Sequence, residues 1–418
     1  MIHISPIAHA WVPVDARAAD RVAAPNYDEF QSDLDVIHFL ESKPDCILKV
    51  TMPHCDLPEP EARMLVEGSE EALSRAGQNF KALTASPWVR AVEDVLAVYA
   101  ITDPTRPSQR QMGLCGLADT RQIRMDDQPD GAIIRNEGIY QHKMLGRAAL
   151  TRAIGAFVES VNLAVDDADG RLIARLEATA DARPCDYEET DHKGNRHQVW
   201  LVEDAEDLQA FVELLAAEPH AYVADGNHRS AAAHNLGCPG FLAVIFTAPR
   251  MRIDPYHRLV HSLGMSWSAF VEAIEPWFEV EPMPGVRAFA PKAVHTLGAY
   301  HHGVWHRLTV REGTYDATDA VQSIDADILQ RRVFLPVLGI TDPTDKRLTF
   351  VGGDKGTAWL EEQVDAGRHE LGLAMAPVTM QQLIDVCLQA RTMPPKSTWF
   401  EPKIQSGLVM AMLELTAR

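Results

Sequence analysis

The sequence predicts an α+β fold, in which strands and helices alternate without a single repeated unit. Two observations support this class: apolar strand-like runs alternate with amphipathic helical segments between residues 89 and 247, and a further set of strands and helices follows from about residue 266. The 418 residues, 46% of them hydrophobic, are sufficient for two or three domains. We expect an N-terminal α+β region over 1–130, a core over 131–265 and a C-terminal α+β region over 266–418 that completes the same pocket.

The N-terminal region is expected to begin with loops. Residues 1–30 contain short apolar stretches interrupted by three prolines, and two more prolines break residues 56–61. The pattern over 59–83 then predicts a helix. The run at 89–102 is expected to end in a strand that pairs with a second strand over 114–118.

The core is expected to alternate strands with helices. A short strand at 131–135 precedes a segment at 141–161 with apolar residues at helical spacing. A turn at 191–194 leads to a strand at 197–202, and an amphipathic helix is predicted over 205–217.

A strand–turn–helix–strand unit follows. The strand at 221–224 is followed by a polar turn and an alanine-rich helix that should end at Gly237, and the next strand covers 240–247. Beyond residue 266, helices are predicted at 267–277 and 380–389, with several strands between them.

Charge and composition exclude several classes of function. The chain has 59 acidic and 39 basic residues and a formal charge of −20, so a phosphate polymer would be repelled and no nucleic-acid partner is expected. No apolar run approaches the roughly 20 residues of a membrane span, and the first residues do not resemble a signal peptide. We therefore expect a cytoplasmic protein without a membrane partner. The six cysteines form no CxxC pair and are expected to be core residues.

The polar turn at residues 225–229 is the first candidate site. Gly226 allows a sharp turn after Asp225, and the following backbone amides become unpaired donors at a helix start that favours an anion. Arg229 adds a guanidinium that can grip phosphate, and Asp225 can bind Mg²⁺ or a second substrate. Alternatively, Asp225 only caps the helix and the other polar side chains are solvated.

Two further groups of residues are candidates for an anion site. A proline-stiffened segment combines two ammonium groups with two hydroxyls, in Lys396, Ser397, Thr398 and Lys403. His257 and Arg258 form a second basic pair behind Pro255. The alternatives are a solvated surface loop for the first group and an ordinary surface salt bridge for the second.

Glu137 is the candidate general base. It lies in the connection between a predicted strand and helix, with Lys143 and Arg147 downstream, although it could also be a solvated loop acid. His301, His302 and His306 lack the helical setting of a metal motif, so we expect an exposed hairpin there.

Several segments resemble one protein family along nearly the whole chain. YVADGNHRSAAA is similar to the [IV]ADGHHR motif of domain-of-unknown-function family 1015, and VAAPNYDEF resembles the VAAPPYDV stretch of that family. IRNE with Lys143 and Arg147 resembles its HE…K…R segment, and DPYHRLV resembles its PTHRLV. MPPKSTWFEPK with Ser406 and Gly407 looks like its PPKST-F-PK signature, which is highly specific.

The resemblance implies a ParB/sulfiredoxin-like nucleotide-binding core with N- and C-terminal extensions. That superfold includes free-serine kinases, which implies a kinase that uses ATP or ADP with Mg²⁺ and phosphorylates a small hydroxyl-bearing substrate such as free L-serine. The implied site residues are catalytic Glu137, Asp225 and His228, with phosphate contacts from Gly226, Asn227, Arg229, His257, Arg258, Lys396, Ser397, Thr398 and Lys403. Asp225 would hold the metal.

Two positions depart from the family pattern. Asn227 and Asn136 stand where related sequences have histidine, or cysteine in sulfiredoxins at the first position. An amide cannot replace an ionisable imidazole in proton transfer. The alternative function is a non-catalytic nucleotide sensor that binds CTP or ATP, and a homodimer is compatible with either function.

Overall fold

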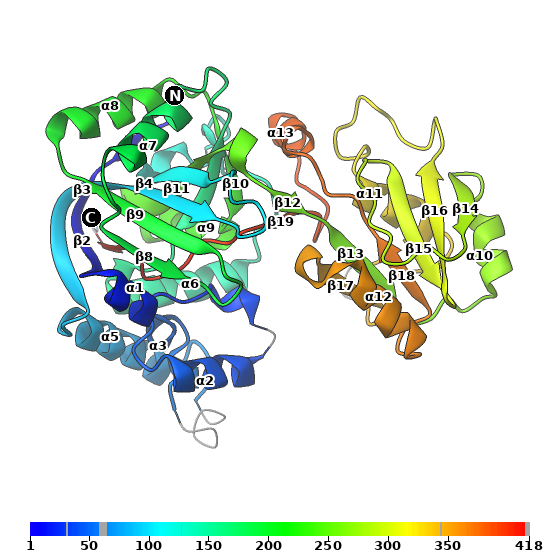
Figure 1. The fold of residues 1–418 in the computed structure, drawn as a ribbon, viewed down its shortest axis with the longest axis horizontal. Coiled ribbons are helices and arrows are strands. Elements are labelled where there is room, and N and C mark those ends of the chain that lie inside the picture. The colour runs from blue at the N-terminus through cyan, green and yellow to red at the C-terminus, as the bar shows by residue number, and fades with distance from the viewer. Residues whose placement is uncertain (31, 58–64, 127, 343–344, 414–418) are drawn as a thin grey trace. The chain divides into compact units, whose positions relative to one another are not determined.

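The structure, a computed structural model, describes residues 1–30, 32–57, 65–126, 128–342 and 345–413 (Figure 1). Contacts divide the chain into unit 1, Met1–Met251 with Pro402–Arg418, and unit 2, Arg252–Glu401. This division differs from the three regions expected at 1–130, 131–265 and 266–418. Strands from the first 130 residues share one sheet with later strands, and the C-terminal segment returns to unit 1. The predicted α+β class is confirmed.

Unit 1 is built on a twelve-stranded sheet with the main order β5-β10-β7-β11-β4-β3-β2-β20-β6, to which β1, β8 and β9 are attached. The strands are β1 Ile4–Ser5, β2 Ile7–Pro13, β3 Val89–Thr102, β4 Gln111–Asp119, β5 Ile133–Arg135, β6 Ala156–Phe157, β7 Val161–Val165, β8 Tyr187–Thr190, β9 Arg196–Val202, β10 Ala221–Asp225, β11 Gly240–Thr247 and β20 Met410–Met412. The long strand β3 pairs with β4 as predicted and also with β2 and β9.

The two faces of this sheet bury different cores. Along β3, Val98 and Ala100 pack on the face covered by α7 (Arg171–Ala182) and α8 (Ala205–Ala216), whereas the alternating Ala97 and Tyr99 pack on the opposite face (Figure 1). Side chains of a strand alternate between faces, so one run of apolar residues serves both cores.

The remaining helices of unit 1 form a third core, to which α5 and α6 contribute, and a smaller separate cluster between α6 and α9. These helices are α1 Ala16–Val22, α2 Asp33–Ser42, α3 Leu48–Thr51, α5 Glu70–Thr84, α6 Gln141–Ile154 and α9 Asn227–Leu236. The helix α9 ends at Gly237 in the left-handed conformation, as the sequence predicts.

The structure corrects the expectation of loops over residues 1–30. Pro6 separates β1 from β2, and Pro13 is the last residue of β2, positions where a missing N–H does not interrupt a central strand. Asp15 then caps α1, with its carboxylate accepting from the amide of Ala18 at 2.8 Å. The prolines therefore delimit regular elements.

Two predicted helices have different bounds in the structure. The helix expected over 141–161 ends at Ile154, because Gly155 adopts φ +73° and the chain continues as β6 and β7. Within the described residues, the helix expected over 59–83 is α5, which begins at Glu70 after its cap Ser69. Residues 59–64 of that prediction lie outside the described part of the chain.

In the strand–turn–helix–strand unit at 221–247, the two strands β10 and β11 are not direct neighbours in the sheet. Strand β7 lies between β10 and β11, antiparallel to the first and parallel to the second. No sequence signal placed a strand at 161–165, because the apolar run there continues the helical spacing of α6.

Unit 2 has its own sheet, with the order β14-β16-β15-β18-β13-β17. Its strands are β13 Tyr256–Val260, β14 Phe278–Met283, β15 Thr296–His301, β16 Val304–Val310, β17 Leu348–Gly352 and β18 Leu371–Ala374, and a separate pair joins β12 Ile253–Asp254 to β19 Trp399–Phe400. Its helices include α10 Trp267–Ile274, α11 Asp325–Leu329, α12 Gly356–Asp365 and α13 Met380–Leu388.

The histidine-rich segment forms the predicted hairpin. Strands β15 and β16 are antiparallel, and His302 and Gly303 between them have φ values of +43° and +83°. Two positive φ values in a two-residue loop are typical of a type I′ turn.

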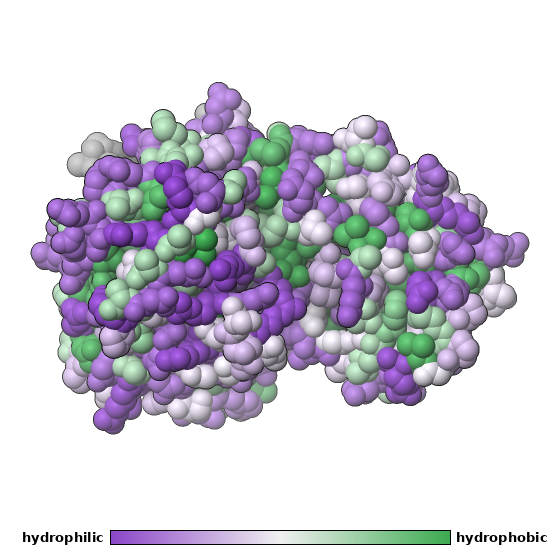
Figure 2. All heavy atoms as spheres, turned by 45° about the horizontal axis from the view of Figure 1, so that its top comes forward, coloured by the Kyte–Doolittle hydropathy of each residue, from purple (hydrophilic) through white to green (hydrophobic). Residues whose placement is uncertain are grey.

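Hydrophilic residues occupy most of the face drawn in Figure 2, with hydrophobic residues between them in small groups. Within the described ranges, no helix combines the length and apolar character needed to cross a membrane.

We predict that Gly407→Ala destabilises unit 1 more than Gly155→Ala. Both glycines have positive φ, +84° and +73°, but a Cβ at Gly407 would lie 3.0 Å from Cβ of Ile47, whereas nothing lies within 4 Å at Gly155. The additional loss should be roughly 1–3 kcal/mol, since a crowded methyl adds to the backbone strain. Chemical denaturation followed by circular dichroism measures the difference. Equal losses would mean that the backbone around Gly407 can move away without cost.

Candidate active site

The segments that carry Glu137 and Asp225 lie side by side at one edge of the large sheet of unit 1. Strands β5 and β10 are parallel neighbours, with Val223 opposite Arg135. Asp225 and Glu137 each lie two residues beyond this pair, so Asp225 is the last residue of β10 and Glu137 follows the carboxyl end of β5. Asn136 Oδ1 accepts from Asn227 Nδ2 at 2.8 Å, which holds the two connections together. This edge is therefore where polar groups from β5–α6 and β10–α9 gather.

Gly226 makes the turn between β10 and α9. Its φ is +93°, and a Cβ there would lie 3.0 Å from Nε of Arg229. The glycine is thus needed both for the backbone conformation and for the close approach of the guanidinium. Gly226 is also the N-cap residue of α9, and no side chain caps this helix start. The interpretation of Asp225 as a simple helix cap is therefore not supported.

Asp225 is the centre of a charge cluster. Its Oδ2 accepts from Nη2 of Arg229 at 2.6 Å, and its Oδ1 lies 3.9 Å from Nζ of Lys403. Burial alone would raise the pKa of Asp225, but Lys403 and Arg229 outweigh it and hold the pKa below its usual value. Arg229 also donates to the carbonyl of Ser160 just before β7. The carboxylate is therefore ionised and balanced by two cations.

This arrangement does not fit a Mg²⁺ ion bound directly by Asp225. Each of its two carboxylate oxygens already faces a cation, whereas Mg²⁺ requires free oxygen ligands in an octahedral shell. The predicted metal role of Asp225 would need the ion pair with Arg229 to open.

Buried amides replace the two expected imidazoles. Asn136 and Asn227 are both buried and hydrogen-bonded to each other, so the two departures from the family pattern form one contact. Asn162 of β7, which lies opposite Asp225 of β10, is buried as well. The Oδ1 atoms of Asn162 and Asn227 have no hydrogen-bond partner among the described residues. Unsatisfied buried polar atoms at a site edge are available to a ligand.

His228 connects the starts of α9 and α6. Its Nε2 accepts from the backbone amide of Tyr140 at 3.1 Å, and the two rings stack with centroids 5.9 Å apart. Burial and the nearby Lys143 lower the pKa of His228 to about 4, so the imidazole is neutral near pH 7. The neutral ring fits a role in holding the two helix starts together.

Arg147 links this edge to a pocket. It pairs with Glu159 at 3.3 Å, and its guanidinium lies 3.6 Å from the centroid of the Tyr27 ring. A pocket of about 410 Å³ lies beside α6, lined by Tyr27, Thr51, Pro53, His54, Glu67, Gly68, Ala72, Leu73, His142, Lys143, Gly146, Arg147 and Leu150. Glu159 directly precedes Ser160, so Arg147 and Arg229 bind neighbouring residues.

The N-terminal and C-terminal motifs also meet in unit 1. Ala24 and Ser406 exchange backbone hydrogen bonds, and Ser406 Oγ donates to Oδ1 of the buried Asn26 at 2.7 Å. This contact fixes the segment that carries Lys403 to the sheet of unit 1.

The other predicted anion contacts lie in unit 2. Arg258 is buried, donates to the carbonyl of Lys396 at 2.9 Å and lies 4.4 Å from the centroid of the Phe350 ring. Burial lowers the pKa of Arg258 to about 9 and that of His257 to about 4. His257 Nδ1 accepts from the amide of Met375 at 3.1 Å. The basic pair is thus an interior group that supports the C-terminal loop, which differs from the alternative of a surface salt bridge.

The loop itself is held by short local contacts. Ser397 Oγ donates to the carbonyl of Pro394 at 2.6 Å, and Lys396 adopts φ +54° with its Nζ 5.4 Å from the Tyr256 ring centroid. Thr398 is half-buried beside them. Lys396 belongs to unit 2, whereas Lys403 belongs to unit 1. Of these two lysines, it is Lys403 that lies close to Asp225.

Sequence reasoning missed Asn162, Glu159 and the carbonyl of Ser160 as parts of this site. All three depend on β7 being inserted beside β10. The only signal in the sequence was a polar ESVN group inside an apolar stretch, which a helical interpretation places on the helix surface.

The chain belongs to the family described as protein of unknown function (DUF1015), whose model matches residues 4–327. No curated protein matches the chain. The solved structures to which it is similar include a free serine kinase in complex with AMP, at 12% identity and a TM-score of 0.34, covering 66% of this chain and 89% of that one. SbnI with a C-terminal truncation from Staphylococcus aureus is also 12% identical, with a TM-score of 0.38 and coverage of 70% and 87%. A conserved hypothetical protein from Pyrococcus furiosus has 12% identity, a TM-score of 0.33 and coverage of 66% and 92%.

We predict that Asp225→Asn destabilises the chain by roughly 2–4 kcal/mol near neutral pH, because it leaves two largely buried cations without their anion. The pKa of Asp225 is lowered in the folded chain, so the stabilisation is complete above the unfolded-state pKa of about 4 and is lost as the pH falls through the folded-state value. Denaturation of wild type and variant at several pH values measures both effects.

The matched control is Asp169→Asn, which removes an exposed pair with Arg171 and should cost much less because water screens that pair. A loss at Asp225 no larger than at Asp169, or one independent of pH, would contradict the charge cluster.

Proposed function

We propose that this protein is a nucleotide-dependent kinase that transfers a phosphoryl group to a small hydroxyl-bearing metabolite. The observation that carries the proposal is the meeting of the uncapped start of α9, the Asp225–Arg229–Lys403 cluster and Glu137 at one sheet edge. Phosphoryl transfer needs positioning and charge neutralisation more than a covalent nucleophile. A site rich in cations and backbone amides suits that requirement.

In this proposal, the nucleotide phosphates occupy the start of α9. The amides after Gly226 and the positive end of the helix dipole favour the anion, and Arg229 can exchange part of its contact with Asp225 for a phosphate oxygen. Lys403 then balances the charge that develops on the transferred group. ATP and ADP are the proposed donors.

Glu137 is the proposed proton acceptor for the substrate hydroxyl. It lies half-buried in the bend between β5 and α6, one strand away from Asp225. Free L-serine is the first acceptor to test, as the sequence motifs imply. Mg²⁺ remains a predicted cofactor, and no step is assigned to it because Asp225 faces two cations.

The unit 2 residues His257, Arg258, Lys396, Ser397 and Thr398 remain proposed phosphate contacts. Alanine substitution at Lys396 tests them most directly, because its side chain is exposed whereas His257 and Arg258 are buried.

A nucleotide sensor without turnover is the second candidate. The buried Asn136–Asn227 contact favours it, because two amides now occupy positions where the family pattern has ionisable groups. A sensor would bind the nucleotide without transferring phosphate to any hydroxyl.

We predict that ATP or ADP binds in calorimetry and that Arg229→Ala lowers the affinity by about 1.5–3 kcal/mol, the value of a charge-assisted hydrogen bond. CTP serves as the comparison for base preference. Arg171→Ala, which removes an exposed arginine of α7, is the control and should leave the affinity unchanged. Unchanged affinity in a folded Arg229→Ala variant would remove the phosphate role of Arg229.

We predict that Glu137→Gln keeps nucleotide affinity but lowers phosphoryl transfer by about 10²–10⁴-fold, with the low end favoured because a loose transition state needs little help from a base. Phosphorus NMR with serine and other small hydroxyl compounds at saturating nucleotide measures the rate. Glu206→Gln, an exposed acid of α8, is the control. Full activity in Glu137→Gln excludes the base role, and binding without transfer by wild type favours the sensor.

A further inference from the structure

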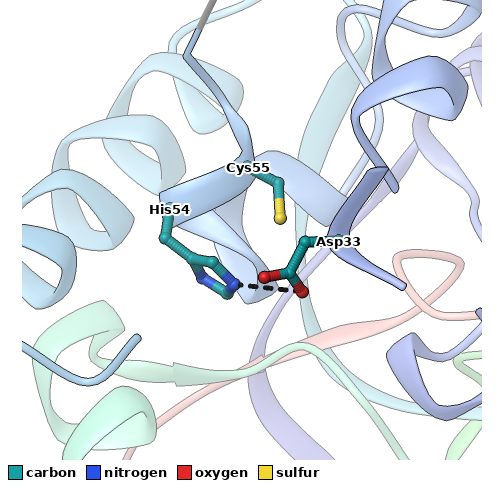
Figure 3. Close-up of side chains that lie close together, drawn as sticks. All are labelled: Asp33, His54 and Cys55. Carbon is teal, nitrogen blue, oxygen red and sulfur yellow. Dashed lines mark ion pairs between the residues drawn. The ribbon is translucent and has the colours of Figure 1, made fainter. Parts of the chain in front are cut away.

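A cluster of three potential metal ligands lies in unit 1, in residues that the proposed kinase chemistry does not use. Asp33 is the first residue of α2, and His54 and Cys55 belong to a short 3-10 helix, η2 (Pro53–Cys55). One ligand atom from each of the three residues lies within 4.8 Å of the other two. Figure 3 shows the imidazole of His54 directed at the carboxylate of Asp33, with the Cys55 sulfur close to both.

The spacing between His54 and Asp33 is unusual for a direct interaction. Nε2 of His54 lies 3.6 Å from Oδ1 of Asp33, which is too long for a hydrogen bond. Two ligands of a tetrahedral Zn²⁺ ion at ordinary bond lengths are about 3.3–3.5 Å apart. The observed separation is therefore close to that of a pair that shares an ion.

The burial of His54 is not explained by hydrogen bonding. Its side chain is only 5% exposed, and Nδ1 is buried without a hydrogen-bond partner among the described residues. A buried imidazole that lacks hydrogen bonds loses its contacts with water without replacing them. A cation bound at Nε2 would give this buried ring a polar interaction, while Nδ1 would still have no partner among the described residues.

Cys55 is buried beside an acidic side chain. It belongs to the helical core of unit 1, and its sulfur lies within 4.8 Å of a carboxylate oxygen of Asp33. A divalent cation would hold the carboxylate of Asp33 and the thiolate of Cys55 together, because it attracts both anions, which otherwise repel each other. The cluster thus resembles a metal site more than a catalytic triad.

We propose that Asp33, His54 and Cys55 bind one Zn²⁺ ion through a carboxylate oxygen, Nε2 and Sγ, with a fourth position left for water. Binding releases the thiol proton of Cys55 to solvent. A set of one sulfur, one nitrogen and one oxygen ligand suits Zn²⁺ and is poorly matched to Mg²⁺, which takes oxygen ligands.

The position of the cluster gives the ion a route in. The Asp33 side chain is 68% exposed, so an ion can first meet its carboxylate and then the two buried ligands. His54 also lines the 410 Å³ pocket beside α6 together with Glu67 and Lys143. The site is separate from the Asp225 cluster and does not depend on the proposed kinase activity.

The test is equilibrium dialysis of the metal-depleted full chain against Zn²⁺, followed by elemental analysis. Wild type should bind about one Zn²⁺ per chain at this site, and Cys55→Ser and His54→Ala should weaken binding by at least roughly 100-fold, because a lost ligand exceeds the usual 10–100-fold effect of an outer contact. Co²⁺ in place of Zn²⁺ should give a thiolate-to-metal absorption band that Cys55→Ser removes.

Two further variants keep the result interpretable. Cys46→Ser changes another buried cysteine of the same helical core that lies outside the cluster, so it should retain the metal. Asp33→Asn changes an exposed residue that should not affect folding, and it should still weaken Zn²⁺. Failure of the wild type to bind Zn²⁺ or Co²⁺, or equal binding in wild type, Asp33→Asn and Cys55→Ser, would overturn the proposal.

Discussion

The contact between Asp225 and Arg229 across Gly226 is the interaction on which the candidate site depends. A Cβ at Gly226 would lie only 3.0 Å from Nε of Arg229, and the same guanidinium donates to the carbonyl of Ser160. This one arginine therefore joins the end of β10, the start of α9 and the residue before β7. In the free protein, the buried guanidinium of Arg229 is paired with Asp225 and so is not left without an anion. When an anionic ligand binds, the same guanidinium can contact it instead.

The C-terminal segment completes this arrangement. Ser406 pairs with Ala24, β20 adds to β2, and Lys403 thereby reaches the carboxylate of Asp225. A residue near the C-terminus thus joins a charge cluster whose other members, Asp225 and Arg229, lie in the middle of the chain. The proline-rich segment before Lys403 belongs to unit 2, where Arg258 supports it from the interior. The C-terminal motif is therefore divided: its residues up to Glu401 belong to unit 2, and those from Pro402 onward belong to unit 1.

A buried pair of amides joins two connections of the candidate site. Asn136 and Asn227 make a buried hydrogen bond that links the connection after β5 to the first residue of α9. A neutral amide pair provides the same link over the whole pH range, whereas a pair of imidazoles would change charge near neutrality. His228 adds a second link, to Tyr140, and its lowered pKa keeps that contact neutral as well. The geometry of this edge should therefore vary little with pH above about 5.

The sequence by itself determined the α+β class, most strands, the end of α9 at Gly237 and the importance of residues 225–229, because local periodicity, glycine conformation and turn chemistry act over a few residues. It did not determine that Pro13 closes a strand, that α6 stops at Gly155, or that β7 enters between β10 and β11, since those outcomes depend on partners distant in the chain. Only the tertiary structure brought Asn162 opposite Asp225, the carbonyl of Ser160 to Arg229, and His54 and Cys55 to Asp33. Such contacts are set by strand order and helix packing, which leave no local pattern in the residues that make them.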